Sequence, residues 1–140
     1  MKIISLLENT TQKCGMEVEH GLSLYIEANG KRILFDMGQS DLFAKNAERL
    51  GIDLSKVDVA VISHGHYDHG GGLGCFLSLN SKAPIYLSRH AFGARFNASG
   101  KYIGLCDSLC SCERIIYTDG DTQIDENMTL CYSDEQRLVR

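Results

Sequence analysis

Four side chains that can bind a metal ion lie within six residues of one another near the middle of the chain. They are His64, His66, Asp68 and His69, in the segment Ser-His-Gly-His-Tyr-Asp-His-Gly-Gly-Gly that spans residues 63–72. The glycines allow the backbone to turn tightly and to approach a bound group closely. Folding alone does not explain the cluster, since unpaired buried aspartate and histidine are costly. The pattern therefore predicts metal-dependent hydrolysis.

The spacing within this segment predicts two pairs of ligands. His64 and His66 are two residues apart, which places both on one side only in an extended or tightly turned backbone. Asp68 and His69 then point toward a second ion. Two ions about 3.5–4 Å apart can share a bridging hydroxide, because a bound metal lowers the pKa of water toward neutrality. Asp68 can bind one ion and orient that hydroxide, so it is the predicted catalytic residue.

The elements expected around the segment predict a single α/β domain over residues 1–140 with a mixed sheet. Apolar and alternating runs predict strands over residues 2–7, 22–28, 32–36, 57–63, 84–87, 115–117, 122–124 and 128–132. Helices are predicted after Ser40, ending at Gly51, and over residues 73–79, with a helical turn or two over 90–96. Residues 97–114 are expected to form a loop or irregular helix. Asp36 ends its strand, where it can hold a histidine ring of the site by a hydrogen bond.

Composition narrows the classes of partner. The 140 residues are 44% hydrophobic, enough for one domain with a core, and the formal net charge is −4. An acidic chain is a poor match for nucleic acid, whose phosphates need a basic surface. The apolar run at the N-terminus is too short for a signal peptide and no stretch could cross a membrane, so we expect a cytoplasmic protein that acts on a small-molecule substrate.

The six cysteines are expected to be reduced in such a protein. Three of them, Cys106, Cys110 and Cys112, lie close together in the sequence. Their spacing is not the C-x-x-C pair of a zinc ribbon. A metal-binding or redox role for these three thiols is the alternative to simple partial burial.

The segment His64-x-His66-x-Asp68-His69 resembles the H-x-H-x-D-H signature of the metallo-β-lactamase superfamily. Residues 34–38, Leu-Phe-Asp-Met-Gly, resemble that superfamily's strand-ending aspartate motif. Residues 19–24 and 63–69 look most like the branch that includes dihydropterin-using synthases of methanopterin biosynthesis. The resemblance implies an αββα sandwich with a dinuclear metal site at the sheet edge, and it places His20 near that site without binding metal.

The resemblance also bears on the metal. The superfamily's oxygen-reducing diiron branch usually has glutamate where His66 stands, which favours up to two zinc ions and hydrolysis here, with iron and manganese as alternatives. The superfamily completes its site with a third histidine, a bridging aspartate and a last histidine from the second half of the domain. After His69 the sequence contains only His90, which is too early to take such a place.

The absence of these later ligands after His69 implies an αββα sandwich truncated to roughly its N-terminal half, with helices on one face of the sheet. Each ion then has two protein ligands, whereas catalytic zinc normally has three, so partial occupancy is expected. An uncovered apolar sheet face favours a homodimer or a missing C-terminal half. The alternatives to a metal-dependent hydrolase are a catalytically inactive truncated remnant, acting as a metal-binding or interaction module, and a cysteine-based metal or redox binder.

Overall fold

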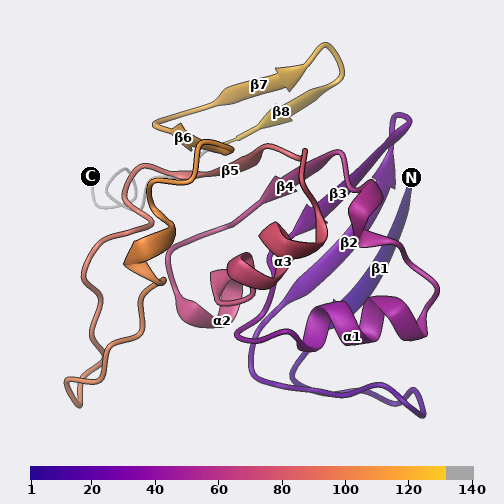
Figure 1. The fold of residues 1–140 in the computed structure, drawn as a ribbon, viewed down its shortest axis with the longest axis horizontal. Coiled ribbons are helices and arrows are strands. Elements are labelled where there is room, and N and C mark those ends of the chain that lie inside the picture. The colour runs from indigo at the N-terminus through magenta and orange to yellow at the C-terminus, as the bar shows by residue number, and fades with distance from the viewer. Residues whose placement is uncertain (132–140) are drawn as a thin grey trace, which may run out of the picture.

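The computed structural model describes residues 1–131, and a six-stranded mixed sheet forms its centre (Figure 1). In spatial order the strands are β1 (Lys2–Leu7), β2 (Ser23–Ala28), β3 (Lys31–Phe35), β4 (Val59–Val61), β5 (Ile85–Ser88) and β6 (Ile115–Thr118). The first three strands pair antiparallel, and β3 to β6 pair parallel. The predicted mixed sheet is therefore confirmed.

The hairpin between β2 and β3 follows from two residues. Asn29 and Gly30 both have positive φ, 52° and 74°, and Ala28 pairs directly with Lys31. Two central residues with positive φ make the type I′ turn, whose twist matches that of the flanking strands. This turn sets the register of β3, and hence the position of Asp36 just beyond the end of that strand.

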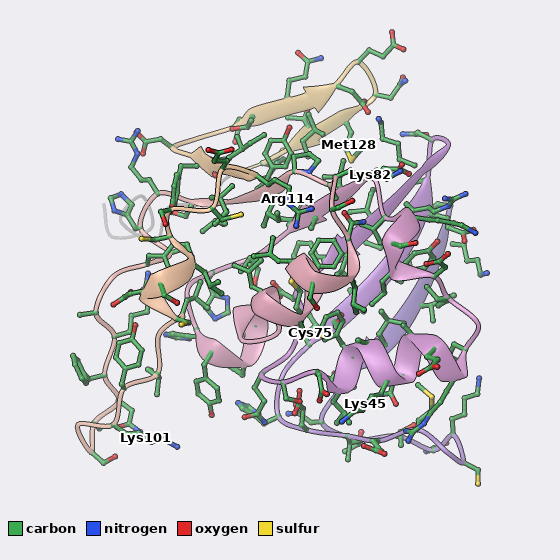
Figure 2. All side chains as sticks on the ribbon, viewed as in Figure 1. Lys45, Cys75, Lys82, Lys101, Arg114 and Met128 are labelled. Atoms are coloured by element: carbon green, nitrogen blue, oxygen red, sulfur yellow. The ribbon has the colours of Figure 1, made fainter. Side chains whose placement is uncertain are left out.

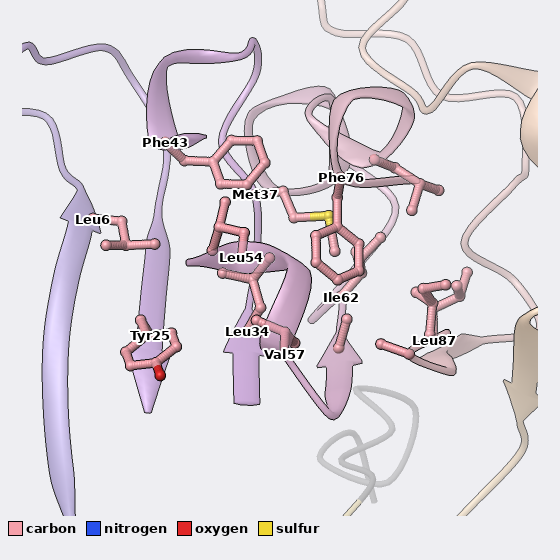
Figure 3. Packing of buried hydrophobic residues seen from close by; sticks show 14 of the residues in the cluster. Leu6, Tyr25, Leu34, Met37, Phe43, Leu54, Val57, Ile62, Phe76 and Leu87 are labelled. Atoms are coloured by element: carbon pink, nitrogen blue, oxygen red, sulfur yellow. The ribbon is translucent and has the colours of Figure 1, made fainter. Parts of the chain in front are cut away.

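The helices pack against one face of the sheet, as expected. They are α1 (Leu42–Arg49), α2 (Tyr67–Gly70) and α3 (Leu73–Leu79), with short 3₁₀ turns η1 (Leu54–Lys56) and η2 (Asp107–Leu109). Figure 3 shows Phe43 of α1 and Phe76 of α3 beside Leu34 and Ile62 from the sheet side of this core. Both phenylalanines are fully buried, so the helical face is a closed hydrophobic core.

The opposite face of the sheet is covered only in part. Side chains alternate along a strand, so Ala60 faces the helices while Val59 and Val61 face away. The hairpin of β7 (Thr122–Asp125) and β8 (Met128–Leu130) packs Ile124 and Leu130 against these valines. Beyond the hairpin the face remains apolar and open at its edges.

The exposed edges of that face can be identified from strand register. Ile3 pairs with Ile26, Ile26 pairs with Ile33, and Ile33 pairs with Val59. Paired residues point to the same side of a sheet, so Ile3 lies on the face of Val59, where it is 54% exposed. Ile116 pairs with Tyr86 on the same face at the other edge and is 40% exposed. In the described residues, apolar side chains of this face are thus exposed at both edges of the sheet, while its centre is buried.

Some predicted elements were wrong in detail. Residues 89–92 form a turn rather than a helix, in which the Ala91 amide donates to the Ser88 carbonyl and the His90 amide donates to the Ser88 hydroxyl. The strand predicted over 57–63 is shorter, because the Ser63 amide bonds to the Asp36 side chain instead of a neighbouring strand. The helix predicted from Ser40 begins at Leu42, whose amide bonds to the Ser40 hydroxyl.

The short helix α2 was not predicted, and residue 132 of the last predicted strand lies outside the described residues. Within residues 1–131, no helix has both the length and the apolar character needed to cross a membrane.

The burial of the core on the helical face can be tested by mutation. Phe76→Ala should lower the free energy of unfolding by about 3–5 kcal/mol, because it leaves a cavity in the closed face. Phe96→Ala makes the same chemical change at a side chain that is 61% exposed, and should cost about 1 kcal/mol or less. Urea unfolding followed by circular dichroism measures both, and equal losses would contradict the assigned core.

Candidate metal centre

The site is organised by one buried carboxylate, that of Asp36. Its backbone amide donates to the Val61 carbonyl at 2.9 Å, which extends the pairing of β3 with β4. Its φ of 58° then turns the chain sharply away from the strand, a conformation that aspartate tolerates better than most residues. The carboxylate accepts hydrogen bonds from the Ser63 amide (2.7 Å), the Ser63 hydroxyl (2.8 Å) and Nδ1 of His69 (2.7 Å).

Backbone hydrogen bonds fix the helix α2 at this end of the sheet. The amide of Met37 donates to the His69 carbonyl at 2.7 Å, and the amide of Leu22 donates to the Asp68 carbonyl at 3.4 Å. Gly38 in turn donates to Leu22 at 3.0 Å. The start of β2, the end of β3 and α2 are therefore tied together, so the residues of α2 have defined positions relative to the strands.

Close packing explains two of the glycines in and around the segment. A Cβ atom at Gly65 would collide with the backbone carbonyl of Ala91, and one at Gly72 would collide with the carbonyl of Met37. Since backbone cannot yield as a flexible side chain can, neither position accepts a larger residue without rearrangement of the loop.

The four predicted ligands come together in space. Nε2 of His64 and Nδ1 of His66 lie 3.1 Å apart, and the rings of His64 and His69 have centroids 4.2 Å apart. Nε2 of His69 lies 3.5 Å from Oδ2 of Asp68. His20 approaches from the β1–β2 loop, with Nε2 3.2 Å from the same Asp68 oxygen.

These separations fit two pairs of metal ligands. Two donors bound at 2.0–2.1 Å to one tetrahedral zinc ion lie about 3.3 Å apart. The His64–His66 pair and the Asp68–His69 pair, at 3.1 and 3.5 Å, bracket that value. Among residues 1–131, however, no group of three or more histidine, cysteine or acidic side chains is arranged to hold an ion. The described chain therefore offers two candidate half-sites, each a pair of possible ligands.

The protonation of His64 suits a metal ligand. Burial lowers the pKa of His64 below its ordinary value, and the neighbouring His69 and His66 lower it further, against the opposing effect of Asp36 and Asp68. A lowered pKa keeps the imidazole neutral at neutral pH, and neutral imidazole has the lone pair that binds metal.

Three residues of the site were missed by the sequence reasoning. Ser63 holds Asp36 through two bonds and also lies 3.0 Å from Nδ1 of His64. Ser23 donates to the Asp36 carbonyl at 2.8 Å, and Glu19 accepts from the amides of residues 39 and 40. Each carried a signal in its position, Ser63 next to His64, and Glu19 and Ser23 within the segment of residues 19–24 that resembles the superfamily. The cysteines 106, 110 and 112 form no metal group in the described part of the chain.

Comparison with known proteins identifies relatives of this chain. A family model described as the metallo-β-lactamase superfamily matches residues 16–135. An uncharacterised protein of Methanocaldococcus jannaschii is 36% identical over 107 residues, which cover 74% of this chain and 40% of that protein. The 7,8-dihydropterin-6-methyl-4-(β-D-ribofuranosyl)-aminobenzene-5′-phosphate synthase of the same organism is 35% identical over 91 residues, covering 61% of this chain and 31% of the synthase.

A solved structure is also similar to this chain. The crystal structure of Tm1679, named as a metal-dependent hydrolase of the β-lactamase superfamily, superposes with a TM-score of 0.74 at 36% identity. That match covers 92% of this chain and 46% of Tm1679, so the chain spans less than half the length of these relatives. The predicted resemblance and the partial αββα fold are confirmed.

The role of Asp36 can be tested through the His69 ring. Asp36→Asn keeps a side chain that tolerates positive φ but loses an acceptor for the Ser63 hydroxyl or His69. We expect His69 to carry its proton on Nδ1 in the wild type, to lose this preference in the variant, and stability to fall by about 2 kcal/mol or more. Long-range ¹H–¹⁵N correlation spectra report the tautomer.

The control is Asp53→Asn, which alters an exposed carboxylate that also accepts two hydrogen bonds, from the amide and hydroxyl of Ser55. It should leave the spectrum of His69 unchanged and cost less stability. An unchanged His69 tautomer in Asp36→Asn would show that the carboxylate does not hold the ring.

Proposed function

Because the chain belongs to the metallo-β-lactamase superfamily, we propose that it is a metal-dependent hydrolase of a small-molecule substrate. His64 and His66 would hold one zinc ion, and Asp68 and His69 a second. The observation that carries the proposal is the pair of half-sites at ligand spacing, one of them fixed by a buried carboxylate. Tm1679, at 36% identity, is named a metal-dependent hydrolase, which supports the same reaction class.

The donor set favours zinc. Three imidazoles and one carboxylate match the nitrogen and oxygen ligands that zinc accepts, and oxygen-preferring ions such as magnesium and calcium are poorly served. Iron and manganese accept the same donors and are the alternatives. A bound ion would supply a hydroxide nucleophile near neutral pH, since it lowers the pKa of water.

The chain's own residues prepare the site for that chemistry. Asp36 accepts a hydrogen bond from Nδ1 of His69 and so leaves the Nε2 lone pair free to bind an ion. Asp68 is only 13% exposed at its side chain and shares one oxygen with His20 and His69. We assign Asp68 the catalytic role of orienting the nucleophile, and His20 the role of holding the Asp68 carboxylate by donating to it.

A complete catalytic site needs more than these four side chains, since catalytic zinc has three protein ligands and a water. We propose that the missing ligands come from whatever covers the open sheet face, either a second copy of this chain or a further segment of a longer polypeptide. Ile3 and Ile116, exposed at opposite edges of the sheet, both lie on that face.

Zinc binding tests the ligand assignment. We expect His66→Ala to weaken zinc binding at least about tenfold, because it removes one of two donors from a half-site. His90→Ala, which removes a histidine outside the cluster, should leave zinc affinity unchanged. Competition with a chromophoric chelator gives the affinity, and elemental analysis gives the ions per chain.

Hydrolysis of 4-nitrophenyl esters and phosphodiesters by the zinc-loaded protein tests the reaction. Asp68→Asn should lower the rate about 100-fold, while Asp41→Asn, on the exposed start of α1, should not. Zinc binding that survives His66→Ala but is lost when Cys106, Cys110 and Cys112 become serine would support the cysteine alternative. Zinc binding without any hydrolysis would support the binding module, and no binding at all would refute the metal site.

Whether a second copy of the chain covers the open sheet face is tested by the mass of the protein in solution. If a second copy covers the sheet, sedimentation should give twice the 15.5 kDa chain mass. Ile116→Asp should then shift the protein to monomer, because a charge on the buried face must be desolvated. Leu79→Asp places the same charge at a leucine of similar exposure on α3, on the helical side, and should not. A wild type that is monomeric at all concentrations would exclude the homodimer.

A further inference from the structure

The loop between β5 and β6 differs in charge from the rest of the molecule. Residues 89–106, here called the basic arm, contain Arg89, His90, Arg95 and Lys101 and no acidic residue, in a chain of net charge −4. Arg89 pairs with Asp119 at 3.0 Å. Within residues 1–131 no carboxylate lies at ion-pair distance from Arg95 or Lys101. Lys101 is exposed and therefore presents a positive charge that the described residues do not neutralise.

The basic arm is an ordered structure that presents aromatic rings to solvent. Phe96 and Tyr102 form an antiparallel bridge and stack edge to face, with ring centroids 5.6 Å apart. Their exposed fractions are 61% and 40%. The turn between them is fixed by Asn97, whose side-chain oxygen accepts from the amides of Ser99 and Lys101. A pre-ordered surface of this kind binds a ligand with little loss of conformational entropy.

The basic arm also contacts the metal-binding segment directly. The amide of Tyr67, which stands between His66 and Asp68, donates to the Ile103 carbonyl at 3.0 Å. The Lys101 ammonium lies 6.0 Å from the centroid of the Tyr67 ring. In Figure 1 the arm extends from the sheet on the side of α2. A ligand held by the arm is therefore held beside the helix that carries Asp68 and His69.

A cavity of about 290 Å³ lies between the basic arm and α2. Its walls include the rings of Tyr67 and Tyr102 and the side chains of Leu73 and Leu105, with glycines 70, 71 and 104 between them. The Tyr102 hydroxyl is already engaged, since it donates to the Leu105 carbonyl at 2.7 Å. The cavity is thus mainly apolar and aromatic, with a cation near Tyr67, and suits a planar ring with an attached anionic group.

We propose that the basic arm and α2 form a substrate pocket for an aromatic small molecule bearing a carboxylate or a phosphate. The ring lies in the cavity against Tyr67 and Tyr102, and the anion contacts Lys101. This inference rests on the proposed function in that it names the substrate class of that hydrolase. It assigns substrate selection to residues outside the metal cluster.

Three naphthalene probes separate the contribution of the aromatic ring to binding from that of the anionic group. Naphthalene-1-carboxylate and naphthalene-1-carboxamide have nearly the same shape and differ in charge, and 1-naphthyl phosphate carries the other anion. The chain has no tryptophan, so probe fluorescence can be excited without a background from indole. We expect both anions to bind about fivefold more tightly than the carboxamide, with the larger gain identifying carboxylate or phosphate as the preferred group.

Variants then test the assigned contacts. Lys101→Gln should remove the preference for the anions and leave carboxamide binding unchanged. Lys82→Gln makes the same change at an exposed lysine far from the arm, as Figure 2 shows, and should have no effect. Tyr102→Leu should weaken all three probes, and Tyr102→Phe should retain them, because the hydroxyl is already engaged by the Leu105 carbonyl and the ring is what the two variants change differently.

The titrations are run with and without zinc, so that attraction of an anion to the ion is measured separately. Equal affinity for carboxylate and carboxamide, or an equal loss in Lys82→Gln and Lys101→Gln, would overturn the proposed pocket. Zinc binding on the same samples separates the two proposals. Probe selectivity without zinc binding refutes the hydrolase and keeps the pocket, while zinc binding and hydrolysis without selectivity refute the pocket alone.

Discussion

The arrangement of the site depends on the burial of a single carboxylate. Asp36 has no solvent exposure, and a buried charge is tolerated only when hydrogen bonds compensate its lost hydration. The donors are the amide and hydroxyl of Ser63 and Nδ1 of His69, all from the segment that follows β4. Satisfying Asp36 therefore requires that this segment fold back over the end of β3, which gathers the histidines at one place.

The same requirement explains why β4 is short. Its hydrogen bonds to neighbouring strands end near Ile62, whose amide donates to the Tyr86 carbonyl, and the next amide, that of Ser63, turns to Asp36. The chain leaves the sheet one residue before His64. His64 and His66 then lie in non-helical backbone, while Asp68 and His69 lie in α2. One short segment thus supplies two pairs of candidate ligands from different backbone conformations.

Much of the fold and of the candidate site could be predicted from the sequence, because the local preferences of the residues agree with the overall fold. The Asn29-Gly30 turn, the alternation in β2 and the helix over residues 73–79 each have a local cause, and the ligand spacing is a local property as well. What could not be read depends on contacts between distant segments. Ser23 and Glu19 act on backbone groups of residues 36–40, a relation that only the folded sheet creates. The basic arm carried a visible charge pattern, but its position beside Tyr67 comes from the path of β5 and β6.

The two incomplete features of the molecule can be understood together. The helical side of the sheet is closed, and the other side is open beyond the β7–β8 hairpin. The candidate site at the end of the sheet would give two donors to each ion. If the missing ligands arrive with whatever covers the open face, metal binding and covering of the face become thermodynamically linked, and each must strengthen the other by the same factor. Metal affinity then depends on how much of the sheet is covered, even though the four donors already lie at ligand spacing. Because Asp36 holds His69 in place before an ion binds, that donor needs little further ordering, and much of the coupling would reside in the ligands that the covering element brings.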